Sequence, residues 1–265
     1  MQSARRWLGE RLLHSSGSLR SLRDFPFIGS LIHRFSHRIL PLDHKVWACV
    51  ESGPAQGLWL ELKPRTGQSY VRGEVETTVQ NILVERLRPG MIFYDLGANI
   101  GLFTLLAARL VGEKGRVVSF EPDPENSARL RRNVERNQFA NVTVVEAGVW
   151  SSSGEFDFVT ADDQSPDRGV GTFIAHEGQP RGTLTRCVSL DDLTETVPSP
   201  DALKCDVEGA EFEVLRGAEK MLKTKHPWII CEIHSELNDW NVREILNRLG
   251  YTIKRLDKNH VLASS

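Results

Sequence analysis

The spacing of apolar residues along the chain changes near Val46, and the change divides the sequence into regions. Helical spacing is seen before it, in ARRWLGERLL. After it, apolar residues alternate in VWACV and LWLEL around a turn rich in glycine and proline, which predicts a β-hairpin over 46–62. We therefore expect an N-terminal extension, 1–45, and a hairpin cap region, 46–73, ahead of the main body, 74–265.

Helices and strands are expected to alternate through the main body. The predicted helices are Glu74–Leu87, Leu102–Val111, Pro124–Asn137, Ala210–Lys223 and Val242–Leu249. The predicted strands are Ile92–Leu96, Arg116–Glu121, Val142–Ala147, Leu203–Asp206 and Trp228–Ile233, followed by a hairpin-like pair, Tyr251–Arg255 and His260–Ala263. Strands that alternate with helices of about 10–15 residues predict an α/β fold with a doubly wound, mostly parallel sheet and an antiparallel C-terminal strand.

One interval, 151–190, breaks this alternation with the loop-forming stretches DDQSPDRG and GQPRG. We expect an insertion of loops and short strands there. A sheet of this kind needs neither the insertion, nor the hairpin, nor the helix Glu74–Leu87. These three segments are therefore expected to build the pocket for a substrate.

Composition places the chain among globular proteins, with 40% apolar and 26% charged residues. No apolar run reaches the ~18–20 residues that span a bilayer, and no secretory signal is visible. The four cysteines are far apart and form no CxxC pair, which fits packing residues in a reducing compartment. We expect a cytoplasmic protein.

Charge is distributed unevenly, although the formal net charge of −2 argues against a general nucleic-acid binder. Residues 1–45 hold eight Lys/Arg and three Asp/Glu, a charge of +5, which leaves −7 for the remaining chain. With Trp7 and its leucines, this basic arm suggests a weak peripheral contact with a membrane surface or a partner; a packing segment is the simpler interpretation.

The first strand of the main body runs into a glycine turn that suits a cofactor. Gly97 permits a tight turn and Gly101 a close approach at the helix start. Asn99 stands where the dinucleotide fingerprint has its second glycine, which favours a nucleoside ligand without a pyrophosphate. Glu121 ends the second strand, where a carboxylate can accept hydrogen bonds from the hydroxyls of a ribose. Together these features predict S-adenosylmethionine as the ligand. The alternative is that Gly97 and Gly101 are ordinary turn glycines and that Glu121 is an acid favoured by the dipole at a helix start.

Acidic residues and a histidine follow the fourth and fifth strands at spacings of two: Asp206 and Glu208, then Glu232 and His234. Methyl transfer to a hydroxyl needs an oriented acceptor and a base. His234 and Asp206 are the leading base candidates, whereas Glu208 and Glu232 would hold acceptor hydroxyls or the histidine. Glu208 as a helix-start acid and His234 as an unpartnered loop histidine remain the alternatives, and Glu76 is a weaker candidate.

Several motifs resemble a known family. DLGANIGLFTLLAA, FEPDP, NVTVVEAGV, KCDVEGAEFEVLRGAEKML and IICEIH occur in the order and spacing of the FkbM-type methyltransferases, over about residues 50–255. The resemblance implies a class I S-adenosylmethionine-dependent fold and O-methylation of sugars or of polyketide and related natural products. The chain departs from the family's usual pattern at Gly148-Val149-Trp150.

The resemblance also implies a cofactor-binding set. Asp95, Gly97, Asn99 and Gly101 would border the methionine part, Glu121 the ribose, and Glu146 and Ala147 the adenine. Ala98, Thr104, Pro122 and Asp206 complete the expected set.

The prediction is thus an O-methyltransferase acting on a hydroxyl of a saccharide or of a glycosylated, lipid-linked or other natural-product metabolite. Carboxylates with one histidine would also suit Mg²⁺, but no dedicated ligand signature is present, and we expect no metal. The alternatives are a metal-dependent or N-directed small-molecule methyltransferase and a methyltransferase-like binding module without turnover.

Overall fold

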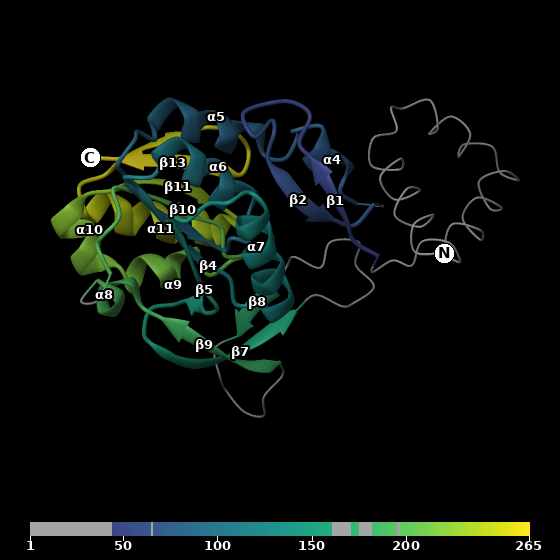
Figure 1. Ribbon diagram of the computed structural model, residues 1–265. Helices are drawn as coiled ribbons and strands as arrows, with labels where there is room; N and C mark the ends of the chain where they lie inside the picture. Colours follow the sequence, from purple (N-terminus) through teal and green to yellow (C-terminus); the bar gives the residue numbers. More distant parts are fainter. Residues whose placement is uncertain (1–43, 65, 161–170, 175–181, 195–196) are drawn as a thin grey trace, which may run out of the picture. The chain divides into compact units, whose positions relative to one another are not determined.

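The computed structural model describes residues 44–64, 66–160, 171–174, 182–194 and 197–265 (Figure 1). The expected helical spacing and membrane contact of the basic arm lie outside these residues. The chain divides into two compact units, one ending at Thr77 and the other beginning at Thr78.

The first unit contains the predicted hairpin. Strands β1 (Val46–Cys49) and β2 (Trp59–Leu62) pair antiparallel, with Val46 opposite Leu62. Helix α4 (Gln68–Val71) follows, and the carbonyl oxygen of Val71 accepts a hydrogen bond of 2.7 Å from the N–H of Glu51. Apolar side chains on one face of the hairpin are buried, as alternation predicts.

The second unit is built on a seven-stranded sheet. All its neighbouring strands are parallel except β13, which runs antiparallel to both its neighbours. This confirms the predicted mostly parallel sheet with an antiparallel C-terminal strand. The order across the sheet is β12 (Thr252–Arg255), β13 (His260–Ser264), β11 (Trp228–Glu232), β10 (Ala202–Cys205), β3 (Ile92–Leu96), β4 (Arg116–Phe120) and β5 (Val142–Val145).

Helices cover both faces of this sheet (Figure 1). Contacts of α6 with β3 and β4, and of α7 with β5, place these two helices along one half of it. A buried apolar cluster joins the sheet to α9, α10 and α11, and includes Tyr94, Leu203 and Val214. The helices are α5 (Thr77–Arg86), α6 (Leu102–Val111), α7 (Pro124–Arg136), α8 (Leu190–Leu193), α9 (Glu211–Arg216), α10 (Glu219–Lys225) and α11 (Glu236–Arg248).

A second, smaller sheet occupies the interval where short strands were predicted. Its order is β6 (Gly148–Val149), β9 (Thr183–Val188), β7 (Gly154–Thr160) and β8 (Gly171–Ile174). The β6–β9 pair is parallel and the other two pairs are antiparallel. The loop-forming stretches that joined these strands in the sequence fall largely outside the described residues.

Three helix predictions need correction. The predicted helix Ala210–Lys223 is two helices, α9 and α10, with Gly217 between them, where a Cβ would lie 2.2 Å from the carbonyl oxygen of Trp150. Helix α11 starts at Glu236 and not at Val242, since the Ser235 hydroxyl caps it by accepting from the N–H of Asn238. Helix α5 begins at Thr77, after Glu76, whose φ of +39° is left-handed.

The cysteines and the character of the helices can also be compared with what the sequence predicted. Cys187, Cys205 and Cys231 are buried free thiols, which confirms that cysteines of the sheet pack as small apolar side chains. Among the described helices, none combines the length and the apolar character needed to cross a membrane.

Candidate active site

A pocket lies at the carboxyl ends of β3, β4 and β10, where parallel α/β sheets bind their ligands. It encloses about 520 Å³, part of it open to solvent. It is lined by Gly97, Asn99, Phe120, Glu121, Pro122, Ala147, Gly148, Val149, Phe158, Asp206, Val207 and Glu208. Seven of the residues predicted from the sequence are therefore brought to one pocket.

The turn after β3 is shaped by Gly97. Its φ is +76°, and a Cβ there would lie 1.7 Å from the carbonyl oxygen of Asp206, so only glycine fits between the two strand ends. The N–H groups of Gly97 and Ala98 both donate to the carbonyl oxygen of Phe120, at 3.0 and 2.9 Å. Asn99 follows with a φ of +50°, a left-handed conformation that asparagine tolerates.

Glu121 forms the second wall of the pocket and is only 5% exposed. Its two carboxyl oxygens accept hydrogen bonds from the N–H groups of Asn99 (2.7 Å) and Asp123 (3.0 Å). Burial raises the pKa of Glu121 to about 8, although these N–H donors lower it. The position of Glu121 on the pocket wall is compatible with the contact to the ribose of S-adenosylmethionine expected from the sequence, and that contact stays a prediction.

Five other predicted cofactor residues lie outside the pocket lining. Asp95 and Thr104 are fully buried and bonded to each other, with the Thr104 hydroxyl 2.6 Å from a carboxyl oxygen of Asp95. Ala98 is buried within the turn, and Gly101 is the left-handed N-cap of α6. Glu146 is exposed, so that of the expected adenine pair only Ala147 lines the pocket.

The pocket also contains residues that sequence reasoning did not assign. Phe158 comes from β7 and is 5% exposed, so the inserted sheet contributes to the cofactor side and not only to a substrate side. Gly148 and Val149, where the chain departs from the family pattern, form β6, pair with β9 and line the pocket.

Asp206 is held by a lysine that the sequence analysis missed. Lys204 is 3% exposed, and its Nζ lies 2.7 Å from Oδ2 of Asp206 and 5.0 Å from the ring centroid of Phe103. Burial raises the pKa of Asp206, but the Lys204 charge and hydrogen bond, together with His234, outweigh it and leave the pKa below its usual value. The available signal was a lysine two residues before an aspartate in an otherwise apolar strand.

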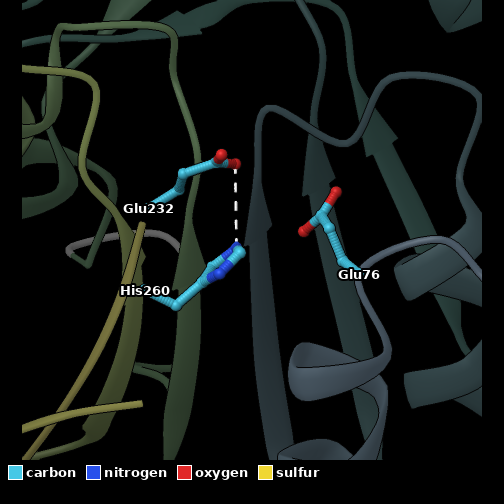
Figure 2. A group of neighbouring side chains, drawn as sticks. All are labelled: Glu76, Glu232 and His260. Atoms are coloured by element: carbon cyan, nitrogen blue, oxygen red, sulfur yellow. Dashed lines mark ion pairs between the residues drawn. The ribbon is translucent and has the colours of Figure 1, made fainter. Parts of the chain in front are cut away.

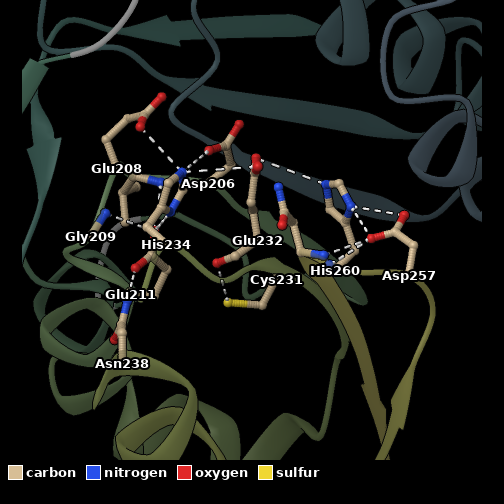
Figure 3. A network of polar contacts seen from close by, with 12 residues as sticks. Asp206, Glu208, Gly209, Glu211, Cys231, Glu232, His234, Asn238, Asp257 and His260 are labelled. Carbon is tan, nitrogen blue, oxygen red and sulfur yellow. Dashed lines mark hydrogen bonds and ion pairs between the residues drawn. The ribbon is translucent and has the colours of Figure 1, made fainter. Parts of the chain in front are cut away.

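Four carboxylates surround His234, the histidine that follows β11 (Figure 3). The ring Nδ1 lies 2.7 Å from Oε1 of Glu211, and Nε2 lies 3.2 Å from Oε2 of Glu208. Oxygens of Asp206 and Glu232 lie 3.8 and 4.0 Å from Nε2. The structure thus brings together all four residues predicted for the chemistry.

The charge state of His234 differs from what a base requires. Burial lowers its pKa, but hydrogen bonds and charges of Glu208 and Glu211 raise the pKa of His234 to about 11. The raised pKa favours the imidazolium form of His234, in which neither ring nitrogen has a free lone pair to take a proton. That form does not suit the role of base, for which His234 was the leading candidate from the sequence, and the identity of the base stays a prediction.

Glu232 is also paired with a second histidine. Figure 2 shows the ion pair, in which Nε2 of His260 lies 3.8 Å from Oε2 of Glu232. His260 is the first residue of β13 and sits opposite Glu232 in register, because antiparallel β13 begins at the edge where the parallel strands end. Asp257 holds the other ring nitrogen at 2.9 Å. Sequence reasoning placed His260 in a strand without assigning it a role.

Three of the residues around His234, counting His234 itself, have the geometry of a candidate cation site. One ligand atom each from Asp206, Glu232 and His234 lies within 4.8 Å of the others. Nε2 of His234 would have to lose its proton to bind a metal ion there, against the surrounding carboxylates. The expectation of a metal-independent site stays a prediction.

Comparisons with known proteins agree with this geometry. Residues 95–253 match the profile of the methyltransferase FkbM domain. The hexuronic acid methyltransferase AglP of Haloferax volcanii is 32% identical over 194 residues, 71% of this chain and 75% of that protein. The 31-O-demethyl-FK506 methyltransferase FkbM of Streptomyces tacrolimicus is 29% identical over 214 residues, 71% of this chain and 77% of that protein.

A solved structure shows the same fold. The FkbM methyltransferase of Methylobacillus flagellatus superposes with a TM-score of 0.50 at 21% identity, over 68% of this chain. This chain covers 44% of that longer protein.

Proposed function

Because the chain belongs to the FkbM methyltransferase family of S-adenosylmethionine-dependent enzymes, we propose that it transfers the methyl group to a hydroxyl of a saccharide or of a glycosylated natural product. The names of two relatives reported above contain hexuronic acid and 31-O-demethyl-FK506, which supports this acceptor class. The observation that carries the proposal is the set of carboxylates at the edge of the cofactor pocket, with Asp206 and Glu208 in its lining.

The carboxylates favour a hydroxyl over a carboxylate as acceptor. A hexuronic acid offers both groups. A carboxylate is already ionised, so its methylation needs no base, and the negative charges of Asp206, Glu208 and Glu232 would repel it. A hydroxyl is neutral and must lose its proton as it reacts, which requires an acceptor for that proton.

S-adenosylmethionine, when bound, supplies a methyl group made electrophilic by a cationic sulfur. Gly97, Asn99 and Glu121 would hold it, and the nearby carboxylates suit its positive charge. The chain's task is then to orient the acceptor oxygen and to receive its proton.

Glu208 is the carboxylate that we assign to the proton. It lines the pocket, and its side chain is 30% exposed. Glu208 lies in the turn after β10 and has a left-handed backbone conformation, with a φ of +53°. Asp206 lines the pocket too, but its side chain is only 17% exposed, and Nζ of Lys204 holds one of its carboxyl oxygens at 2.7 Å. Glu208 would accept the proton of the acceptor hydroxyl while that oxygen takes the methyl group that S-adenosylmethionine would supply.

The test is transfer of labelled methyl from S-adenosylmethionine to a panel of acceptors: neutral methyl hexosides, hexuronic acid glycosides, a macrolide alcohol and a primary amine. Each reaction is run with chelator and with added Mg²⁺. We expect label on hydroxyl-bearing acceptors in both conditions, and a loss of about 10²–10⁴ in turnover for Glu208→Gln. Glu213→Gln, two residues into α9 and paired with Arg216, is the matched control and should retain activity.

Label on the amine alone would replace the proposal with N-methylation. Activity that is lost in chelator and restored by Mg²⁺ would replace it with a metal-dependent transfer. Cofactor binding without product on any acceptor would favour a binding module.

A further inference from the structure

Glu211, the first residue of α9, belongs to the polar network in Figure 3, where it lies beside Gly209, His234 and Asn238. Its side chain has no exposed surface. Oε1 accepts hydrogen bonds from the N–H groups of Gly209 (3.0 Å) and Val207 (3.4 Å), and lies 2.7 Å from Nδ1 of His234. Oε2 accepts from the side-chain amide of Asn238 on α11. One buried carboxylate thus joins the turn after β10, the end of β11 and helix α11.

The neighbours of His234 determine where its protons are. Glu211 faces Nδ1 and Glu208 faces Nε2, and an ionised carboxylate can only accept hydrogen bonds. A carboxyl oxygen beside each ring nitrogen fits the imidazolium form, the one form in which both ring nitrogens donate. The pKa of about 11 for His234 is consistent with this geometry.

Charges on every side of the ring act in the same direction. Asp206 at the end of β10, Glu208 in the following turn, Glu211 on α9 and Glu232 on β11 are the acids that face it. Two other side chains approach the same acids: the Lys204 ammonium pairs with Asp206, and Nε2 of His260 lies 3.8 Å from Glu232. An imidazolium at the centre reduces the repulsion among acids that would otherwise move apart.

We propose that Glu211 is a positioning residue for the hydroxyl methylation proposed above: it holds the ring of His234 as an imidazolium that draws the acceptor-side carboxylates together. A carboxylate, and not the histidine, then takes the acceptor's proton. The inference rests on the proposed function for its catalytic meaning, but the state of His234 is measurable without any acceptor.

A simpler role for Glu211 would be to cap the turn before α9 through the N–H groups of Val207 and Gly209. That role would affect folding but would leave the protonation of His234 unchanged. A readout on the imidazole itself separates the two roles.

The experiment is a pH titration of the ¹⁵N-labelled full chain by NMR, following the imidazole nitrogens of His234, which His234→Gln identifies by loss of their signals. We expect both nitrogens to stay protonated well above the usual histidine range, near 6.5. Glu211→Gln should lower the titration midpoint by about one pH unit or more, a tenfold or greater loss of proton affinity. Glu213→Gln, on the same helix and paired with Arg216, should leave it unchanged.

Kinetics supply the second readout. With a hydroxyl acceptor from the panel, Glu211→Gln should lower kcat more than it changes KM for S-adenosylmethionine, and should add an inflection to the pH profile of kcat at the new midpoint of His234. Glu211→Asp keeps the negative charge but withdraws it from His234 by one methylene. It should lower the midpoint of His234 by less than Glu211→Gln, and it is the variant to titrate if Glu211→Gln does not fold.

A His234 that titrates near pH 6.5 in the unsubstituted protein would overturn the inference, whatever the variants do. So would a midpoint that Glu211→Gln leaves in place. If the titrations come out as expected but no hydroxyl is methylated, the proposed function fails and the arrangement of Glu211 and His234 stands.

Discussion

The backbone N–H of Asn99 donates a 2.7 Å hydrogen bond to Oε2 of Glu121, and this bond ties the glycine turn after β3 to the end of β4. The second oxygen of Glu121 accepts from Asp123, just before α7. One buried side chain therefore shapes two walls of the cofactor pocket, in addition to its predicted contact with the ribose.

Glu121→Gln should weaken binding of S-adenosylmethionine about tenfold to hundredfold. An amide has one acceptor oxygen for two N–H donors, so one donor would face an NH₂ group, at a cost of about 1–3 kcal/mol. Calorimetric titration with S-adenosylmethionine measures the effect. Glu135→Gln, an exposed glutamate on α7, is the control and should bind normally; equal affinity of the two variants would remove Glu121 from the binding site.

Gly97→Ala should destabilise the protein far more than Gly112→Ala. Both glycines have positive φ, +76° and +66°, but a Cβ on Gly112 meets no atom within 4 Å, whereas on Gly97 it meets the backbone of Asp206. Gly112→Ala then carries only the backbone strain, about 1–2 kcal/mol. Urea denaturation compares the two, and similar losses would contradict the close packing of the β3 and β10 ends.

Lys204→Met should cost about 3–5 kcal/mol of stability, because it leaves the mostly buried charge of Asp206 without its cation. Methionine retains much of the lysine's apolar stem over Phe103, which limits the loss of packing. The double variant Lys204→Met with Asp206→Asn removes both charges and should regain part of the loss. A single variant as stable as the unsubstituted protein would show that the pair contributes nothing.

Stability should fall as pH rises from about 6.5 toward 11 because of His234. The folded state holds a proton with a pKa of about 11, whereas the unfolded chain releases it near 6.5, so the stabilisation is complete below 6.5 and is lost through the folded pKa. Melting temperatures at about pH 6, 8 and 10 measure this. The advantage over His234→Gln should shrink along the series; a constant advantage would contradict the raised pKa.

The fold was predictable where local patterns decide it. Strand Ile92–Leu96 and helix Leu102–Val111 have the bounds that their apolar spacing predicts. The break between α9 and α10 was not predictable from local patterns. Gly217, which lies in this break, packs against the backbone of Trp150, more than 60 residues away in the chain.

The sequence was enough to predict which residues meet at the site, but not which charged partners each of them has. Alignment of strand ends was enough to bring Asp206, Glu208, Glu232 and His234 together. The contact between His234 and Glu211 was missed, because the position of Glu211 in the helix start gave no sign that it faces a histidine 23 residues later. Lys204 carried a signal, since a lysine within a buried strand needs a partner.

The chemical bond in the product tests the central claim most directly. The enzyme is incubated with deuterated-methyl S-adenosylmethionine and a hexuronic acid glycoside, which offers hydroxyls and a carboxylate on one ring. The product is then treated with mild alkali and followed by mass spectrometry and NMR. We predict a methyl ether on a ring hydroxyl, stable to alkali and strongly reduced in Glu208→Gln; a methyl ester that alkali removes, formed equally by both proteins, would contradict the account.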